Sequence, residues 1–238
     1  MTKQKMSQDE LKQKAAIYAV EFVESGMVLG LGTGSTTQFA LKRIAARIKS
    51  GDLKNVVGIP SSIRTEKLAR ELGIALSDLD HHPEIDLTID GADEVDPDLN
   101  LIKGGGGALL REKILAQATR RNIIIVDESK LSPQLGTNWA LPVEVIPFAC
   151  KTEQKFLASI GGPATLRADK TGRAFITDQQ NLILDADFGR LSDPMELASR
   201  LNQRAGIVEH GLFLRLANDV IVAAKEDVRH LESNRNNK

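Results

Sequence analysis

Residues 90–113, DGADEVDPDLNLIKGGGGALLREK, gather the groups best suited to chemistry within one short stretch. The charged residues of interest are Asp90, Asp93, Lys103 and Glu112, and four consecutive glycines follow the lysine. Asp90 closes an apolar run, IDLTID, that is typical of a buried strand. It should emerge at the carboxyl end of that strand, where open α/β sheets bind their ligands. The stretch therefore predicts an active site that uses acids, a cation and bare backbone amides.

The acidic run within this stretch has three interpretations. A metal site fits poorly, because the spacing of an EF-hand or a DxDx[TV] phosphatase loop is absent, so we expect no metal. A solvated surface loop is the second interpretation, and we expect it for Glu94. In the third, Asp90 and Asp93 flank the Gly91–Ala92 turn and aim both carboxylates at one ligand. Lys103 and its glycines favour this third interpretation, because such a loop would otherwise be costly to order.

Glu112 is predicted to lie on a helix with its carboxylate facing inward. At about 100° per residue, Arg111, Lys113 and Gln117 should point elsewhere. The neighbours of Glu112 in this projection are Ala108, Leu115, Ala116 and Thr119. Among such side chains, we hypothesise that burial raises the pKa of the carboxyl, which suits a base that takes and returns a proton. The preceding glycines, Gly104 to Gly106, would let amides approach an oxyanion at the mouth of this helix.

A second glycine cluster, GLGTGSTT at residues 30–37, lies where a strand should turn into a helix. It fails the dinucleotide fingerprint, since Ser35 stands where the third glycine belongs, and it lacks the Gly-Lys pair of a Walker A loop. Thr33, Ser35 and Thr36 offer hydroxyls, and Gly34 exposes an amide beside the positive end of the helix. This arrangement suits a phosphate monoester. An N-capping turn without a ligand is the alternative.

Lys130, in VDESK, follows the apolar run NIIIVD and should reach the same edge of the sheet as Asp90. A second phosphate contact is the functional interpretation, and a solvated lysine the ordinary one. The histidines His81, His82, His210 and His230 lack ligand spacing and a Ser or Cys partner motif, so they are expected to be structural or exposed. The lone cysteine, Cys150, stands in an apolar setting and is expected to be a structural core residue.

Composition narrows the class of protein. The chain has 238 residues, 42% of them hydrophobic, and 31 basic residues against 32 acidic ones. It can bury a sizeable core, and its charge balance favours neither nucleic acid nor an anionic membrane as a partner. A single cysteine excludes an internal disulfide and fits a reducing compartment. With no signal-like N-terminus and no run of about 20 apolar residues, a soluble cytoplasmic protein with a small-molecule substrate is expected.

Strands and amphipathic helices alternate in the first half of the chain. Helices are expected at 11–22, 37–48, 65–72 and around Glu112, and strands at 27–32, 55–60, 74–79, 85–90 and 122–127. This rhythm predicts a doubly wound, mostly parallel, Rossmann-like α/β sheet.

From about Gly136 the pattern changes to β-α-β-β-α-β, which predicts an inserted ferredoxin-like α+β domain. The catalytic domain should comprise residues 1–135 plus 214–238, and the insert 136–213. Strand 219–225 should rejoin the first sheet, and the polar end, 230–238, should fray.

Five segments in this order resemble ribose-5-phosphate isomerase, type A: GLGTGSTT, IDGADEVD, KGGGGALLREK, VDESK and LPVEVIPF. The resemblance continues through ITD, LILD and IVEHGLF, whereas residues 179–187 and the tail after Arg229 match loosely. It implies interconversion of D-ribose 5-phosphate and D-ribulose 5-phosphate, in the non-oxidative branch of the pentose phosphate pathway. It also implies a homodimer or tetramer that needs neither metal nor other cofactor.

The resemblance implies which residues bind substrate and that Glu112 is the base, and the chemistry of the reaction suggests the roles of Lys103, Asp90 and Asp93. Substrate binding falls to Thr33, Gly34, Ser35, Thr36, Asp90, Gly91, Ala92, Asp93, Lys103, Gly104, Gly105, Gly106 and Lys130. Glu112 becomes the base that moves the proton between C2 and C1, and Lys103 the electrophile for the enediolate oxygen. Asp90 and Asp93 are the candidates for the proton movements of furanose ring opening.

Two other functions are compatible with an α/β sheet of this kind. A sugar-phosphate sensor would need a DNA-binding element, and the single helix before the first strand leaves no room for a helix-turn-helix. An acyl- or CoA-transferring enzyme would use Glu112 as a nucleophile. The compact GTGST loop favours a small phosphorylated sugar over an acyl or CoA group.

Overall fold

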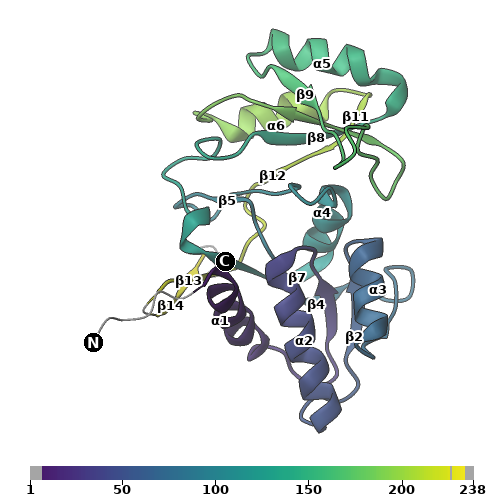
Figure 1. Cartoon of the computed structure of the whole chain (residues 1–238), viewed down its shortest axis with the longest axis vertical. Coiled ribbons are helices and arrows are strands. Elements are labelled where there is room, and N and C mark those ends of the chain that lie inside the picture. The colour runs from purple at the N-terminus through teal and green to yellow at the C-terminus, as the bar shows by residue number, and fades with distance from the viewer. Residues whose placement is uncertain (1–6, 226, 234–238) are drawn as a thin grey trace. The chain divides into compact units, whose positions relative to one another are not determined.

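The computed structural model describes residues 7–225 and 227–233, and the chain divides into two compact units (Figure 1). The first unit comprises Met1–Ala92, Glu112–Lys130 and Leu216–Lys238, and the second comprises Asp93–Arg111 and Leu131–Arg215. The predicted domain limits differ from these units mainly by assigning residues 93–111 to the first. This segment lies in the second unit because its short strands β5 (Glu94–Val95) and β6 (Leu101–Ile102) form a sheet with β12 (Leu212–Phe213).

The first unit is built on a mostly parallel sheet. Within the described residues its order is β14-β13-β7-β4-β1-β2-β3, and only β14 runs antiparallel to its neighbour. The strands are β1 (Val28–Leu31), β2 (Val57–Pro60), β3 (Ala75–Leu76), β4 (Ile85–Asp90), β7 (Thr119–Asp127), β13 (Asp219–Ala223) and β14 (Val228–Glu232). The sheet grows in opposite directions from β1 and β4, so the strand order reverses between them. In doubly wound folds such a switch point is where ligands bind.

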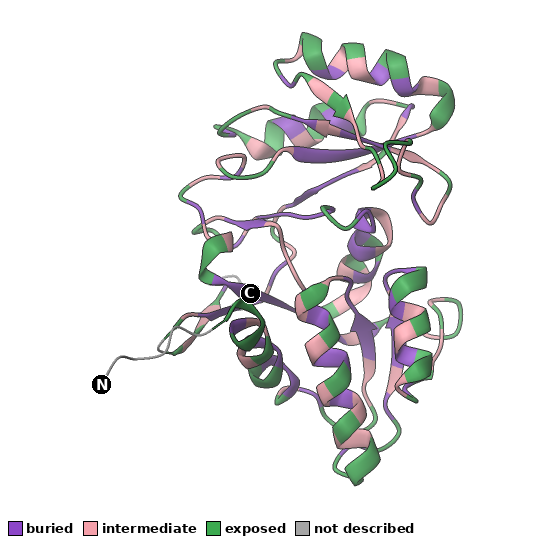
Figure 2. Ribbon diagram, in the orientation of Figure 1, coloured by how far each residue is buried: buried purple, intermediate pink, exposed green. Residues whose placement is uncertain are grey.

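The helices of the first unit are α1 (Gln8–Val20), α2 (Ser35–Ser50), α3 (Ile63–Glu71) and α4 (Leu109–Ala118), which enters this unit at Glu112. A capping box at Ser7 starts α1, and the Ser62 hydroxyl caps α3. Figure 2 shows buried and exposed residues alternating along α2 and α3, as expected when one helix face packs on a sheet. Buried aliphatic residues from each of β1, β4 and β7 form one core cluster with residues of α1 and α2.

The second unit contains the predicted ferredoxin-like insert. Its elements are β8 (Leu141–Val145), α5 (Cys150–Ser159), β9 (Ala164–Leu166), β10 (Leu182–Ala186), α6 (Pro194–Asn202) and β11 (Ile207–His210). The sheet order β11-β8-β10-β9 is antiparallel throughout. Cys150 is 9% exposed and lies in the core of this unit, as its apolar surroundings predict. The prediction of a Rossmann-like sheet with a ferredoxin-like insert is confirmed.

The C-terminal end differs from the prediction. Residues 230–232 do not fray but belong to β14, which pairs with β13 over the full length of both strands. Short polar strands of this kind are hard to recognise because they lack apolar alternation. Residues 234–238, the rest of the predicted frayed tail, lie outside the described residues.

Candidate functional site

The candidate residues are shared between the two units. Thr33 to Thr36, Asp90 to Ala92, Glu112 and Lys130 belong to the first unit, and Asp93 and Lys103 to Gly106 belong to the second.

Asp90 lies at the carboxyl end of β4, beside the switch point of the sheet. The carboxylate is 3% exposed, and its Oδ1 accepts hydrogen bonds from the backbone N–H of Thr33 at 3.1 Å and of Gly91 at 2.7 Å. A Cβ on Gly32 would lie 2.3 Å from the same oxygen, so only glycine fits there. The loop after β1 is therefore shaped around the Asp90 carboxylate.

The loop after β1 leads directly into α2 at Ser35. Its N-cap is Gly34, with φ at +139°, and no side chain caps the helix. Ser35 is exposed and Thr36 half-buried at this end of the helix. Uncapped first-turn amides and the helix dipole together favour an anion, as the sequence predicts for the GTGST loop.

The Thr33 hydroxyl takes part in an internal network. Its Oγ1 lies 2.8 Å from the Ser61 hydroxyl, 2.7 Å from Ser62 and 2.9 Å from Thr65, and the residue is 8% exposed. These three residues were not among the predicted site residues, although SSIRT follows strand β2 and carries the Ser-x-x-Thr spacing of a helix cap. The network ties the loop after β1 to the start of α3.

Glu112 is 5% exposed on α4, which agrees with the predicted inward face. Lys113, which was expected to point away from the face of Glu112, is also only 5% exposed, so burial on α4 is not limited to the Glu112 face. The helical projection assumed one covered face, whereas residues on more than one side of α4 are buried. Thr119, taken as a helical neighbour, is already the first residue of β7.

Lys130 ends a short 3-10 turn, Glu128–Lys130, that follows β7. The turn is held by Asp127, whose Oδ1 accepts from the Ser129 backbone N–H at 3.0 Å and from the Ser129 hydroxyl. Asp90 ends β4, and Lys130 follows β7. Since β7 pairs in parallel with β4, both residues lie at the carboxyl edge of the sheet.

In the second unit, Asp93 and Gly105 are in direct contact. The Gly105 backbone N–H donates to Asp93 Oδ2 at 2.7 Å, and a Cβ on Gly105 would lie 2.6 Å from Oδ1. Gly104 has a φ of +103° and Gly107 one of +77°, which side chains other than glycine rarely adopt. The glycine run is thus needed for its backbone path, and Gly105 and Gly106 remain exposed.

Lys103 is a buried cation, 3% exposed. Its backbone N–H donates to the Gly211 carbonyl at 2.9 Å, and Nζ lies 5.4 Å from the centre of the Phe213 ring. An aromatic face at this distance stabilises an ammonium group whose hydration is reduced. The arrangement places a positive charge directly before the glycine run.

Glu94 was expected to be solvated, and this expectation is wrong. It is fully buried, and its two oxygens accept hydrogen bonds from the backbone N–H groups of Gly136, Thr137 and Asn138 at 2.9–3.1 Å. The carboxylate anchors a loop more than forty residues away along the chain. Its role in the structure is therefore to hold the second unit together.

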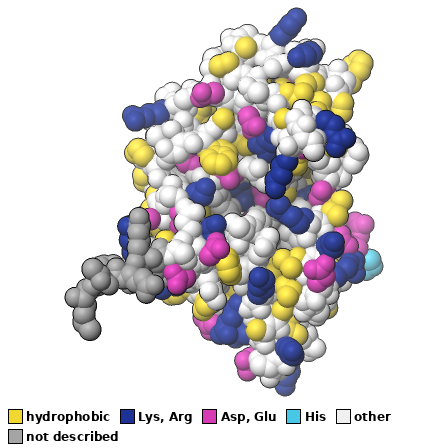
Figure 3. Space-filling view, viewed as in Figure 1, with side chains coloured by type: hydrophobic (Ala, Val, Ile, Leu, Met, Phe, Trp, Pro, Cys, Tyr) yellow, Lys and Arg dark blue, Asp and Glu magenta, His cyan; other side chains and the backbone are white. Residues whose placement is uncertain are grey.

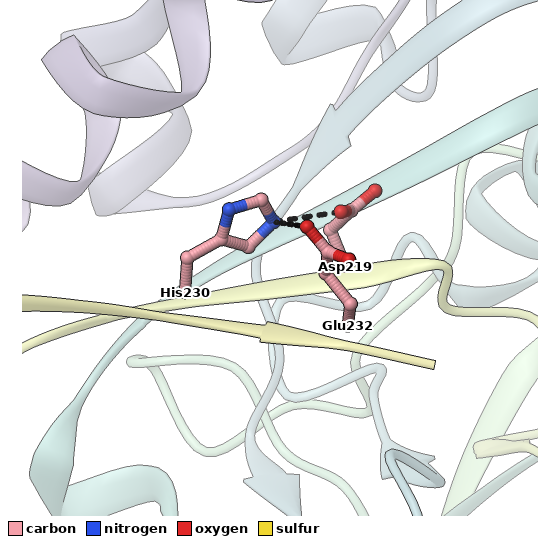
Figure 4. A group of neighbouring side chains, drawn as sticks. All are labelled: Asp219, His230 and Glu232. Atoms are coloured by element: carbon pink, nitrogen blue, oxygen red, sulfur yellow. Dashed lines mark hydrogen bonds and ion pairs between the residues drawn. The ribbon is translucent and has the colours of Figure 1, made fainter. Parts of the chain in front are cut away.

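One further group has the spacing of metal ligands: Asp219, His230 and Glu232 (Figure 4). Asp219, however, accepts hydrogen bonds from Arg121 on both oxygens, at 2.7 and 3.0 Å, and from His230 Nε2 at 2.7 Å. Burial acts to raise the pKa of Asp219, but the hydrogen bonds from Arg121 and His230 outweigh it and hold the pKa below its usual range. We interpret the group as an ion-pair network that ties β14 to the sheet.

Figure 3 shows how charged side chains are distributed over one face of the molecule. Over the first unit, basic and acidic side chains are interspersed there and form no large patch of one sign. This mixture fits the formal net charge of -1. In the part of the chain that the structure describes, no helix has both the length and the apolar character needed to cross a membrane.

The sheet order and the position of Asp90 define a doubly wound α/β protein, a class of fold that binds its ligands at the switch point of the sheet. The profile of the ribose 5-phosphate isomerase A (phosphoriboisomerase A) family matches residues 57–227. The chain belongs to this family.

Relatives of known name and structure agree with this assignment. The chain is 60% identical to ribose-5-phosphate isomerase A of Desulfatibacillum aliphaticivorans, over 95% of this chain and 99% of the relative. Identity to the Chloroflexus aurantiacus enzyme is 56%, over 94% of each chain. A solved D-ribose-5-phosphate isomerase in complex with phospho-erythronic acid superimposes with a TM-score of 0.93 at 42% identity, over 95% of this chain and 100% of that one. Ribose 5-phosphate isomerase A of Methanocaldococcus jannaschii gives a TM-score of 0.90 at 40% identity, with the same coverage.

Proposed function

We propose that the chain interconverts D-ribose 5-phosphate and D-ribulose 5-phosphate through an enediolate, with Glu112 as the general base. The observation that carries this proposal is the buried carboxylate of Glu112 in a member of this isomerase family. Moving a proton between C2 and C1 requires one base that serves both carbons. A carboxylate at 5% exposure is shielded from water, which would otherwise compete for the proton.

Lys103 and the glycine run are proposed to stabilise the negative oxygen of the enediolate. The ammonium group of Lys103 is buried, so its charge acts with little screening by solvent. Gly105 and Gly106 leave backbone exposed to a ligand. Preorganised donors of this type act on charge that develops during the reaction and need no reorganisation.

The phosphate is proposed to bind at the start of α2, with Lys130 as a second contact. The uncapped amides of α2 and the exposed Ser35 support the first contact. The place of Lys130 after the neighbouring parallel strand of β4 supports the second. Binding energy gained at the phosphate positions the sugar carbons for proton transfer.

Asp90 and Asp93 are proposed to assist opening of the furanose ring, which moves a proton from the anomeric hydroxyl to the ring oxygen. Each carboxylate is oriented by a backbone N–H, from Thr33 and Gly91 for Asp90 and from Gly105 for Asp93. Groups held in this way can exchange a proton with a ligand without first changing rotamer.

The ligand of a similar isomerase supports this reaction. That protein was solved in complex with phospho-erythronic acid, which joins a phosphate to a short sugar acid. A carboxylate at the end of such a chain resembles the charged oxygens of an enediolate, and ligands that resemble a reaction intermediate bind tightly. We infer that the same acid competes with ribose 5-phosphate for this protein.

We further propose a cytoplasmic, metal-independent homo-oligomer that serves the non-oxidative branch of the pentose phosphate pathway. The balanced charge and the lone buried cysteine support the location. The acidic residues support metal independence: Glu94 is satisfied by backbone amides, and Asp96 accepts from the backbone N–H groups of Asp98 and Asn100.

Incubation of the purified protein with ribose 5-phosphate tests the proposed activity. Ketose should form and reach equilibrium with the aldose, and phospho-erythronic acid should slow its formation. Ribose without phosphate is the control and should react far more slowly, because the phosphate contacts are lost. Binding of ribose 5-phosphate without ketose formation would contradict the proposal and favour the sugar-phosphate sensor.

A further inference from the structure

One peptide group in the glycine run is held at both ends by charged side chains of the second unit. The Gly104 carbonyl accepts from Arg167 Nη1 at 2.6 Å, and the Gly105 N–H donates to Asp93 Oδ2 at 2.7 Å. The carbonyl and N–H of a trans peptide point in opposite directions, so these two contacts fix the plane of the group. A second, longer contact joins Arg167 Nη1 to the Gly105 carbonyl at 3.3 Å.

The Arg167 guanidinium is itself held firmly. Nε donates to Asp185 Oδ2 at 2.9 Å and Nη2 donates to Oδ1 of the same carboxylate, which forms a two-point ion pair. The side chain of Arg167 is 14% exposed. Its backbone N–H donates to Ile183 and its carbonyl accepts from Phe175, so the residue is built into the sheet of the insert.

The segment after Arg167 contacts the same run at two further points. A Cβ on Gly107 would lie 2.4 Å from the Phe175 ring, so the ring packs on bare backbone there. In the amide orientation that satisfies both groups, Gln179 accepts hydrogen bonds from Arg111 Nε and Nη2 at 2.6 and 2.8 Å. Residues 167–179 therefore contact the Gly104–Arg111 segment at several points along it, from Gly104 to Arg111.

We propose that Arg167 is a positioning residue that orients Asp93 and the Gly106 amide through the peptide groups it holds. A guanidinium on the Gly104 carbonyl polarises the peptide, so the Gly105 N–H becomes a stronger donor to Asp93. Arg167 also contacts the Gly105 carbonyl, so the N–H of the same peptide group, which is that of Gly106, points away from Arg167. Gly106 itself is exposed. This inference rests on the proposed function, in which Asp93 and these amides serve the reaction.

The variant Arg167→Met keeps the length of the side chain and removes its donors. Turnover of ribose 5-phosphate should fall about 10- to 100-fold, less than for the removal of a donor that contacts the substrate directly. KM should change less than about threefold, because the phosphate contacts stay. Arg167→Lys should recover part of kcat. Added guanidinium should restore part of the activity of Arg167→Ala, which a general loss of packing would not allow.

Arg173→Met is the matched control, because this arginine belongs to the same segment and its side chain is 82% exposed and contacts Thr171 and Asp169, not the glycine run. It should retain wild-type kcat. If Arg167→Met matches Arg173→Met in kcat, or if neither lysine nor guanidinium restores turnover, the positioning role is wrong.

Amide hydrogen exchange separates this inference from the proposed function. In Arg167→Met the Gly105 N–H should exchange faster than in Arg173→Met, because its peptide plane is released. A wild-type protein that does not isomerise ribose 5-phosphate would refute the proposed function, and with it the catalytic consequence of the Arg167 contact. An active wild type with unchanged Gly105 exchange and unchanged kcat in Arg167→Met would refute the positioning role alone.

Discussion

At the scale of single residues, the two aspartates of the DGAD turn are oriented by the same device. Asp90 accepts two backbone N–H groups beside Gly32, and Asp93 accepts the N–H of Gly105. At both places a Cβ on the glycine would fall within 2.6 Å of a carboxylate oxygen. The glycines therefore allow backbone N–H groups to reach the two carboxylates. The sequence predicted that such N–H groups would contact an anionic ligand, but not that they would contact Asp90 and Asp93.

The candidate residues that the sequence identified are those with local signals. A strand end, a helix start and a glycine run are visible within a few residues of Asp90, Ser35 and Gly105. The role of Glu94 was not predictable, because its partners Gly136 to Asn138 are more than forty residues away. The Arg167 contact with Gly104 spans 63 residues and was missed for the same reason.

Lys130→Ala tests the phosphate contact. Loss of one cation should raise KM for ribose 5-phosphate about 10-fold, roughly the effect of one charged contact, with little change in kcat. Steady-state kinetics provide the measurement. Lys54→Ala is the control, since this exposed lysine precedes β2 at the opposite edge of the sheet. An unchanged KM in Lys130→Ala would remove Lys130 from the phosphate site.

At the scale of elements, apolar strands and amphipathic helices were predictable because burial imposes a period on the sequence. IDLTID and NIIIVD became β4 and β7 at the centre of the sheet. Strand β14, VRHLE, carries no such signal, since it is a polar edge strand held by pairing with β13 and by ion pairs. Long-range pairing of this kind is decided by the partner strand and not by local propensity.

Arg121→Met tests the network that holds β14. Asp219 is 1% exposed, so removal of its guanidinium partner leaves a buried carboxylate with His230 alone. The free energy of unfolding should fall by about 2 to 3 kcal/mol, less than for a fully buried pair because Arg121 is partly exposed. Chemical denaturation measures this change. Arg120→Met, an exposed neighbour paired with Glu84 and Asp86, should leave stability nearly unchanged, and equal losses in both variants would contradict this account.

Glu144 in β8 makes the stability of the protein depend on pH. Burial raises the pKa of its carboxyl, only partly opposed by hydrogen bonds from Asn181 and Thr177. The folded state therefore holds the proton to higher pH than the unfolded state does. Its stabilising contribution is complete below the ordinary pKa of a glutamate and is lost as the pH rises through the raised value.

The variant Glu144→Gln lacks this titration. Relative to it, the wild type should lose stability as the pH rises, which denaturation at several pH values will show. Glu71→Gln, at the exposed end of α3, should follow the wild-type curve. Parallel curves for the wild type and Glu144→Gln would mean that the Glu144 pKa is not raised.

At the scale of the whole molecule, the fold class and the family were predictable from the sequence. Five short motifs carried this prediction, because these motifs are distributed through much of the chain. The family profile covers residues 57–227 and includes segments of both compact units. The assignment of residues 93–111 to the second unit was not predicted. Strands β5 and β6 are only two residues long, and β12, with which β6 pairs, comes more than a hundred residues later.

The proposed metal independence concerns the whole molecule and has a direct test. Treatment with EDTA followed by dialysis should leave turnover of ribose 5-phosphate unchanged, since protein donors satisfy the acidic residues nearest the candidate site. A parallel sample supplied with Mg²⁺, Mn²⁺ or Zn²⁺ is the control. Activity that EDTA abolishes and one of these ions restores would make the acidic loop a metal site.

The most direct test of the account compares the wild type with Glu112→Gln during turnover of ribose 5-phosphate in D₂O. Glutamine keeps the shape of the side chain but cannot accept the proton. Wild-type enzyme should produce ribulose 5-phosphate with deuterium at C1, whereas Glu112→Gln should bind substrate and lose at least about 1,000-fold in kcat. Glu71→Gln should behave as the wild type. Near-normal turnover and deuterium incorporation by Glu112→Gln would contradict the assignment of Glu112 as the base.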